Sequence, residues 1–279
     1  MLIDLHTHTT ASDGILTPAA LVHAVRTAGV EVFSITDHDS VDGCVEAETL
    51  ARDAKLRLIP GIELSVYWRH VELHVLGYFL DARDAELLGF LARMRSDRLA
   101  RLHQMIGRCW AMGMQVSAEE ALAHARDGNV GRPHLARVLV ERGVVATMDE
   151  AFDRYLGTDK PAYVPRPEVS PADAIRVIHE AGGLASLAHP GIHNRDEAIA
   201  DLAAAGLDAL EVYHPNHVPY KAARYRRLAA ARGLLITGGS DFHGAIDEVH
   251  ASAPGTPNLP EDDFRRLEVA AASRHAGRR

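Results

Sequence analysis

The sequence of 279 residues predicts an α/β barrel that carries a helical insertion. Two observations lead to this fold class. Short apolar runs alternate with helical patterns over most of the chain, which is the order that α/β proteins with parallel sheets show. Several of these runs end at a histidine or an acidic residue, and barrel enzymes place their functional residues at the carboxyl ends of the strands. One long segment lacks such runs and marks the insertion.

The helices and strands of the barrel follow from local boundary signals. Thr17-Pro18 combines a capping hydroxyl with a proline at the first helical position, and Gly29 ends the pattern. Ser170-Pro171 begins a later helix in the same way. The expected helices cover residues 19–28, 44–54, 172–181, 196–205 and 219–232, and the expected strands, all buried and parallel, cover 30–36, 58–62, 71–76, 184–188, 207–213 and 234–237. The tail at 271–279 is expected to fray.

The segment from Asp81 to Pro167 contains helical patterns and no convincing strand. Helices are expected at 84–112, 117–126, 133–142 and 148–156, and Ser117 followed by Glu120 has the form of a capping box. We therefore predict a barrel domain of residues 1–80 and 168–279, and a helical insertion of residues 81–167. Insertions in strand-to-helix connections lie above the active face of a barrel, so this one is expected to cover that face.

Composition limits the possible partners. The net charge of −8 and the pI of about 6.1 argue against binding to duplex DNA, but they allow a small anionic substrate held by local arginines. No apolar stretch approaches the roughly 18 residues that cross a membrane, and no secretory signal precedes the first strand, so a cytoplasmic protein without a membrane partner is expected. The two cysteines are expected to remain free thiols.

His6-Thr-His8 follows the first apolar run and is the first candidate metal site. Residues two apart in a strand point to the same side, so both imidazoles project from one edge. Two converging imidazoles repel each other when protonated and leave buried lone pairs when neutral, and a divalent cation resolves both problems. Taken alone, the pair is equally compatible with two surface histidines.

The same arrangement recurs at or near the ends of the later strands, which favours the metal site. The candidate ligands are His6, His8, Asp13, His38, Glu63, His74, His189, Asp241 and His243. One cation takes four to six ligands, so this set suits two or three ions, with Glu63 bridging a pair. Nitrogen and oxygen donors without thiolates fit Mn²⁺, Zn²⁺ or Fe²⁺, and the carboxylates favour Mn²⁺.

Four further residues are candidates for binding substrate phosphate. Arg132 and His134 stand at a predicted helix start, where backbone N–H groups and an adjacent arginine attract anions. Lys160 is one of only three lysines in a chain that is otherwise basic through arginine. His193 follows His189 by four residues and has three possible roles: binding phosphate, protonating a leaving oxygen, or capping its loop.

Other polar residues near the candidate ligands allow more than one interpretation. Asp37 and Asp39 flank His38 and are expected to orient ligands or to accept hydrogen bonds within the loop. His214 and His217 could reach the site or could belong to a turn.

These motifs resemble those of the polymerase and histidinol phosphatase (PHP) family of phosphoesterases. The resemblance rests on Asp4-Leu-His6-Thr-His8, Thr36-Asp37-His38-Asp39, Glu63, His189-Pro190 and Ser240-Asp241-Phe-His243. It implies a distorted (β/α)7 TIM-like barrel with a trinuclear metal centre. The implied ligand sets are His6, His8, Glu63 and Asp241 for one ion, Glu63, His74 and His189 for a second, and Asp13, His38 and His243 for a third. Several relatives have histidine where this chain has Asp13, which again favours manganese over zinc.

Three short motifs resemble those of one branch of the family, which carries a helical insertion. They are Gly131-Arg132-Pro133-His134, Lys160-Pro-Ala-Tyr163 and Glu211-Val-Tyr-His214-Pro. This branch includes 3′,5′-nucleoside bisphosphate phosphatases and a 5′→3′ exoribonuclease. The resemblance implies a phosphomonoesterase that releases the 3′-phosphate of a nucleoside 3′,5′-bisphosphate, such as adenosine 3′,5′-bisphosphate, by attack of a metal-bridging hydroxide. The catalytic set expected from it is Asp13, Glu63, His193 and Asp241.

Three alternatives remain open at this point. A 5′→3′ exoribonuclease that trims RNA 5′ ends would use the same metal ligands. The net charge of −8 mildly opposes the positively charged groove that a long RNA would need. A histidinol-phosphate phosphatase would share the metal centre but fits the helical insertion poorly. A noncatalytic metal-stabilised module would not need all nine ligands.

Overall fold

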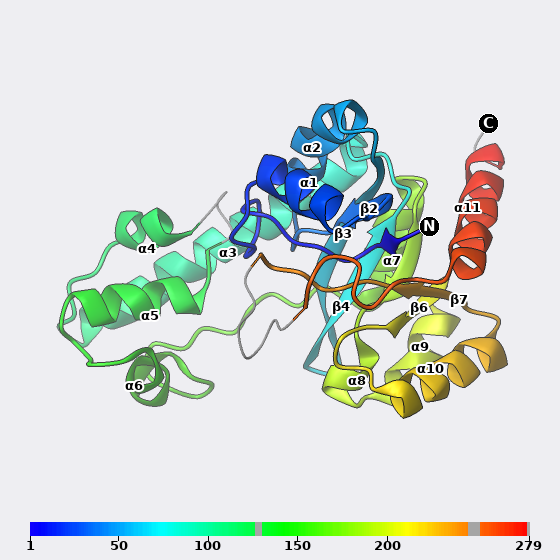
Figure 1. Cartoon of the computed structure of the whole chain (residues 1–279). Coiled ribbons are helices and arrows are strands. Elements are labelled where there is room, and N and C mark those ends of the chain that lie inside the picture. Colours follow the sequence, from blue (N-terminus) through cyan, green and yellow to red (C-terminus); the bar gives the residue numbers. More distant parts are fainter. Residues whose placement is uncertain (126–129, 245–251, 278–279) are drawn as a thin grey trace. The chain divides into compact units, whose positions relative to one another are not determined.

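The computed structural model describes residues 1–125, 130–244 and 252–277 (Figure 1). The chain divides into two compact units. The barrel unit consists of Met1–Gly89 and Glu168–Arg279, and the insertion unit is Phe90–Pro167.

Seven strands form the sheet of the barrel unit in sequence order (Figure 1). They are β1 (Ile3–Asp4), β2 (Val32–Ile35), β3 (Arg57–Trp68), β4 (Val71–Tyr78), β5 (Leu184–Leu187), β6 (Ala209–Tyr213) and β7 (Leu235–Gly238). The backbone N–H of Leu5 donates to the carbonyl of Gly238 (3.2 Å), and His8 donates to the carbonyl of Phe242 (2.9 Å), so the two ends of the sheet meet. The predicted fold class is confirmed: the chain forms a nearly closed, seven-stranded α/β barrel.

The prediction that all strands are parallel is wrong for β4, which runs antiparallel to both β3 and β5. Only Arg69 and His70 separate β3 from β4, and both have positive φ angles (48° and 67°). Parallel strands need a crossover of a dozen or more residues, so a two-residue connection forces a hairpin. As a result, His74 projects from the interior of a hairpin strand rather than following a parallel strand end.

Helices of the barrel unit begin largely where the caps predicted them. Thr17 accepts a hydrogen bond from the backbone of Ala20, and Ser170 accepts one from Asp173. The helices are α1 (Pro18–Thr27), α2 (Asp42–Asp53), α7 (Pro171–Glu180), α8 (Pro190–His193), α9 (Asp196–Ala204), α10 (Pro219–Arg232) and α11 (Glu261–Ala276). The helices α1 and α2 pack on β2 through a buried cluster that includes Leu21, Ala47 and Phe33.

The prediction of a frayed tail from residue 271 is wrong for the described residues, because α11 continues to Ala276. Phe264, Leu267 and Ala271 are buried along one face of this helix. This apolar face holds α11 against the rest of the barrel unit.

The regular secondary structure in the described residues of the insertion unit is helical. Helix α3 (Ala85–Ala111) enters it and is followed by α4 (Ala118–His124), α5 (Arg132–Glu141), α6 (Met148–Ala151) and a π-helical turn, η1 (Phe152–Leu156). Ser117 and Glu120 form the predicted capping box. The unit has its own apolar core, in which Leu102, Leu135 and Leu139 are almost completely buried.

Cys44 and Cys109 are buried free thiols. None of the helices in the described parts of the chain is long and apolar enough to span a bilayer.

Closure of the barrel requires a residue without a side chain at Gly239. A Cβ at this position would lie 2.3 Å from the backbone nitrogen of His6 and 2.8 Å from Asp4 Oδ1. Gly239→Ala is therefore expected to destabilise the barrel unit by about 3 kcal/mol, the upper range for overpacking, as measured by urea denaturation. Gly107→Ala is the control, because nothing lies within 4 Å of that site on an exposed turn of α3. Equal stability of the two variants would contradict the expectation.

Candidate metal centre

The nine predicted ligands all belong to the barrel unit, and the fold brings them together. His6 and His8 follow β1, His38 follows β2, and His189 follows β5, while Asp241 and His243 follow β7. Glu63 and His74 lie within β3 and β4. Except on the antiparallel β4, each ligand-bearing strand presents its residues toward the carboxyl end of the barrel, as barrel enzymes do.

Glu63 lies at the centre of the ligand group. Its Oε2 is 3.2 Å from Nε2 of both His6 and His8 and 3.4 Å from Nδ1 of His38. Its Oε1 is 3.0 Å from Nδ1 of His74 and 3.1 Å from Nε2 of His189. Burial alone would raise the pKa of Glu63, but the surrounding imidazoles, above all His38, hold it well below its usual range. Both oxygens thus face imidazole nitrogens, as a bridging carboxylate requires.

Asp241 completes a second group with the two histidines of the first strand. Its Oδ1 is 3.3 Å from Nε2 of His6 and 3.2 Å from Nε2 of His8. Its Oδ2 is 3.2 Å from Nε2 of His214. The potential ligand atoms of His6, His8 and Asp241 are close enough together to bind one ion.

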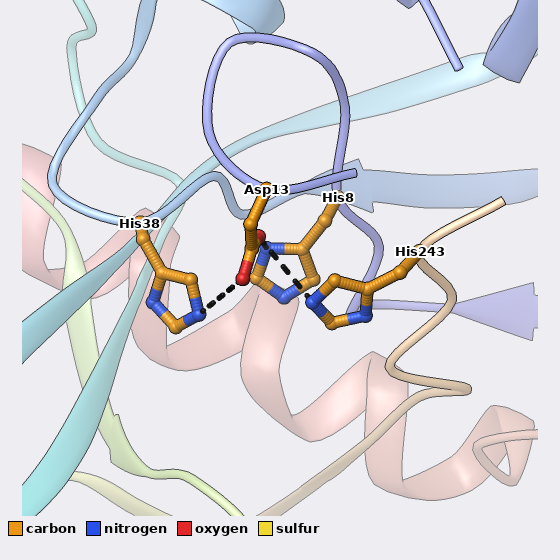
Figure 2. A group of neighbouring side chains, drawn as sticks. All are labelled: His8, Asp13, His38 and His243. Atoms are coloured by element: carbon orange, nitrogen blue, oxygen red, sulfur yellow. Dashed lines mark ion pairs between the residues drawn. The ribbon is translucent and has the colours of Figure 1, made fainter. Parts of the chain in front are cut away.

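Asp13 gathers the third group, which Figure 2 shows. One of its oxygens is 3.3 Å from Nε2 of His243, and the other is 3.6 Å from Nε2 of His38. Oδ1 also lies 3.6 Å from Nδ1 of His8, so His8 belongs to this group as well. The three imidazoles come from three separate strand ends, and Asp13 reaches them from the loop before α1.

The donors fit divalent metal ions. Nδ1 of His189 is buried without a hydrogen-bond partner in the described part of the chain. Burying an imidazole nitrogen without a partner is costly, and coordination removes that cost. Burial lowers the pKa of His38 to about 3. Burial would also lower the pKa of His8, but hydrogen bonding to Asp241 and Glu63 raises it to about 10. Imidazoles and carboxylates without thiolates suit Mn²⁺, Zn²⁺ or Fe²⁺.

The two aspartates beside His38 serve as acceptors that fix loops. Asp37 accepts from the backbone and hydroxyl of Thr9 (both 2.7 Å) and from Ser12 Oγ (2.7 Å), which secures the loop that carries Asp13. Asp39 accepts from the backbone of Ser65 at 2.8 Å and from its hydroxyl at 3.0 Å.

Glu211 is a site residue that was not among the predicted ones. It is fully buried in β6, and its Oε1 lies 2.8 Å from Nδ1 of His6. Its Oε2 accepts a hydrogen bond from the backbone N–H of His189 at 2.6 Å. One carboxylate therefore orients two predicted ligands. The sequence contains one signal for this role, because Glu211 is an acidic residue inside the apolar run 207–213, which was predicted to be a buried strand.

His193 lies beside the ligand group. Its ring centroid is 5.8 Å from that of His189 and 6.4 Å from that of His74. Burial, with help from the neighbouring His189 and His74, lowers the pKa of His193 to about 4. Its Nε2 is buried without a hydrogen-bond partner among the described residues.

Arg132, His134 and Lys160 belong to the insertion unit. The Arg132 guanidinium lies over the rings of Tyr163 (5.5 Å) and Phe152 (5.7 Å). Nδ1 of His134 accepts from the backbone N–H of Gly131 at 2.9 Å and so caps its own helix, α5. The backbone N–H of Lys160 donates to the carbonyl of Gly157 in a turn after η1. Their role in binding phosphate stays a prediction.

A nearly closed α/β barrel with histidines and carboxylates gathered around one buried glutamate defines a metal-dependent hydrolase. Comparison with known proteins gives the family. The PHP domain family matches residues 4–106. The chain is 38% identical to the 5′-3′ exoribonuclease Rnm of Salmonella typhimurium (strain LT2), over 87% of this chain and 85% of that protein. It is 33% identical to the 3′,5′-nucleoside bisphosphate phosphatase of Chromobacterium violaceum, over 96% of each.

A solved structure gives the same result. The chain superposes with a TM-score of 0.78 and 32% identity on a proposed metal-dependent phosphoesterase from Bifidobacterium adolescentis, covering 95% of this chain and 94% of that one. This protein belongs to the PHP domain family of metal-dependent phosphoesterases.

Proposed function

We propose that this enzyme hydrolyses the bond between phosphorus and the 3′-oxygen of a nucleotide that carries a 5′-phosphate. In a nucleoside 3′,5′-bisphosphate, breaking this bond releases phosphate and leaves the 5′-monophosphate. At the 5′ end of an RNA, breaking the same bond releases one 5′-mononucleotide and leaves a new 5′-phosphate. The activities named for the two relatives thus differ only in what the 3′-phosphate carries.

The observation that carries this proposal is the buried Glu63, with both oxygens among five imidazoles. We propose that the centre holds three divalent ions, with Mn²⁺ favoured over Zn²⁺ and Fe²⁺ because carboxylates contribute to each group. When bound, such ions lower the pKa of water and stabilise negative charge on the phosphoryl oxygens. Glu63, Asp13 and Asp241 supply the negative charge that keeps several cations close together.

The remaining candidates are proposed to hold the substrate. Nε2 of His193 is buried beside the ligand group without a partner in the described residues, so it is available to a substrate oxygen. This supports contact with phosphate or with the leaving 3′-oxygen over the alternative of capping a loop. Arg132, His134 and Lys160 of the insertion unit are proposed to bind phosphate, since arginine suits bidentate contact with phosphate.

We propose RNA 5′ ends as the main substrate, with the nucleoside bisphosphate as the shortest one. The sequence alone favoured the bisphosphate. The relative named as an exoribonuclease is 38% identical, against 33% for the phosphatase, and this supports the larger substrate. The phosphatase remains a second candidate because that relative matches 96% of both chains, insertion included.

Product analysis with Mn²⁺ tests the proposal. We expect a 5′-phosphorylated hexaribonucleotide to release 5′-mononucleotides stepwise, and adenosine 3′,5′-bisphosphate to yield 5′-AMP and phosphate. The same RNA with a 5′-hydroxyl, and 3′-AMP, are the matched controls and should react at least about 100-fold more slowly, the loss expected when a charged contact is missing. Release of 3′-mononucleotides would contradict the proposed bond. Rapid turnover of the bisphosphate with inert RNA would establish the second candidate.

A further inference from the structure

The turn that carries His189 and His193 has a strained backbone. His189 adopts φ 26° and ψ 55° and precedes the short helix α8, and Asn194 at its other end has φ 51°. Residues with a side chain rarely adopt positive φ, and such a conformation persists only when its surroundings hold it in place. The direction in which His189 points toward Glu63 therefore depends on contacts made to this turn.

Gly191, in the middle of the turn, is bound on both sides by side chains from one later segment. Its N–H donates to Nε2 of His217 at 3.0 Å. Its carbonyl accepts from Nζ of Lys221, in the first turns of α10, at 2.9 Å. Together with the contact from Glu211 to the backbone of His189, three side chains hold the backbone of His189 and Gly191.

His217 is fixed in one orientation and one tautomer. It is buried, and its Nδ1 donates to the carbonyl of Val212 at 3.0 Å, so Nε2 is left to accept from Gly191. Its ring packs on Tyr225, with centroids 4.9 Å apart. A Cβ on residue 191 would lie 2.6 Å from the His217 ring, so only glycine allows this close approach.

We propose that His217 and Lys221 are positioning residues that fix the turn at Gly191 and thereby aim His189 into the metal centre and hold His193 beside it. Both act through the backbone of Gly191 and not by binding metal. The inference rests on the metal centre proposed above, but it does not depend on which substrate the enzyme takes.

Two near-isosteric variants separate positioning from packing. The side-chain amide oxygen of glutamine can occupy the position of Nε2 of His217. The variant His217→Gln can therefore still accept a hydrogen bond from the backbone N–H of Gly191. The side-chain amide nitrogen of asparagine can occupy the position of Nδ1 of His217. The variant His217→Asn therefore keeps the hydrogen bond to the carbonyl of Val212 and loses the hydrogen bond from Gly191. Mn²⁺ affinity, measured by calorimetry on the metal-free protein, is the first readout, and the midpoint of thermal unfolding is the second. Neither readout requires a substrate.

We expect Mn²⁺ binding in His217→Asn to be weaker by about tenfold or more, the usual cost of losing a partner that orients a ligand, while His217→Gln stays within about threefold of wild type. Lys221→Met, which keeps the apolar stem, should also weaken Mn²⁺ binding without lowering the unfolding midpoint, and it tests the proposal even where a His217 variant does not fold. Wild-type Mn²⁺ affinity in both His217→Asn and Lys221→Met would overturn the proposal. So would a larger loss in His217→Gln than in His217→Asn, because that result would assign His217 to packing around Val212.

Discussion

Replacing Glu63 with glutamine is expected to lower turnover by about a thousandfold or more and to remove bound metal. Each Glu63 oxygen faces imidazoles at 3.0–3.4 Å, and glutamine keeps the volume while it removes the charge and one of the two acceptors. The loss of a single uncharged contact to a transition state already costs 10²–10³-fold, and a charged bridging ligand should cost at least as much. Metal content per chain and kcat/KM are the measurements.

Glu46→Gln is the matched control for this prediction. Glu46 is exposed on α2, so the same chemical change there should leave both metal content and turnover at the wild-type level. Should Glu63→Gln retain the full metal content, Glu63 would not be a ligand. Should it retain metal but lose turnover, the carboxylate would act on the reaction and not on metal retention.

The fold class and the candidate ligands could be predicted because the signals for them are local. A histidine or carboxylate at the end of an apolar run needs no knowledge of distant residues, and the barrel topology then brings such ends together. The same local rules predicted the caps at Thr17, Ser117 and Ser170.

Two predictions were wrong although the sequence contains local signals that contradict them. Arg69-His70 is too short a link between β3 and β4 for any arrangement other than a hairpin. The second signal is the spacing of Phe264, Leu267 and Ala271, which is that of the apolar face of a helix. This spacing predicts the helix α11, whereas the basic composition of the tail had favoured fraying.

Glu211 could not be assigned from the sequence for a different reason. The alternation of a strand tells which residues share a face, but the position of Glu211 relative to His6 depends on how β6 pairs with its neighbours. In the structure Leu210 pairs with both Leu187 and Ile236, and this register brings Glu211 within hydrogen-bond distance of His6 and His189. Orientation of ligands by buried acids is thus a property of the assembled barrel.

Asp13→Asn is expected to lower turnover by about 100-fold while leaving the fold intact. Asp13 lies on a loop with 53% of its side chain exposed, so its replacement leaves no cavity. Partial desolvation by the surrounding side chains would raise the pKa of Asp13, but His38 and His243 hold it well below its usual range, so a carboxylate there is charged and neutral asparagine does not replace it. We expect metal content to fall by about one ion per chain, as measured by elemental analysis, with an unchanged unfolding midpoint.

Asp13→His provides the matched comparison, because the other members of this ligand group, His8, His38 and His243, are all imidazoles. An imidazole restores a metal ligand but is softer than a carboxylate, so this variant should regain activity and shift its preference from Mn²⁺ toward Zn²⁺. This shift in metal preference would separate two functions of Asp13. One is to complete the third ligand group, and the other is to determine which metal that group binds. Wild-type turnover and metal content in Asp13→Asn would remove the group around His8, His38 and His243 from catalysis and reduce the centre to the ions held at Glu63 and Asp241.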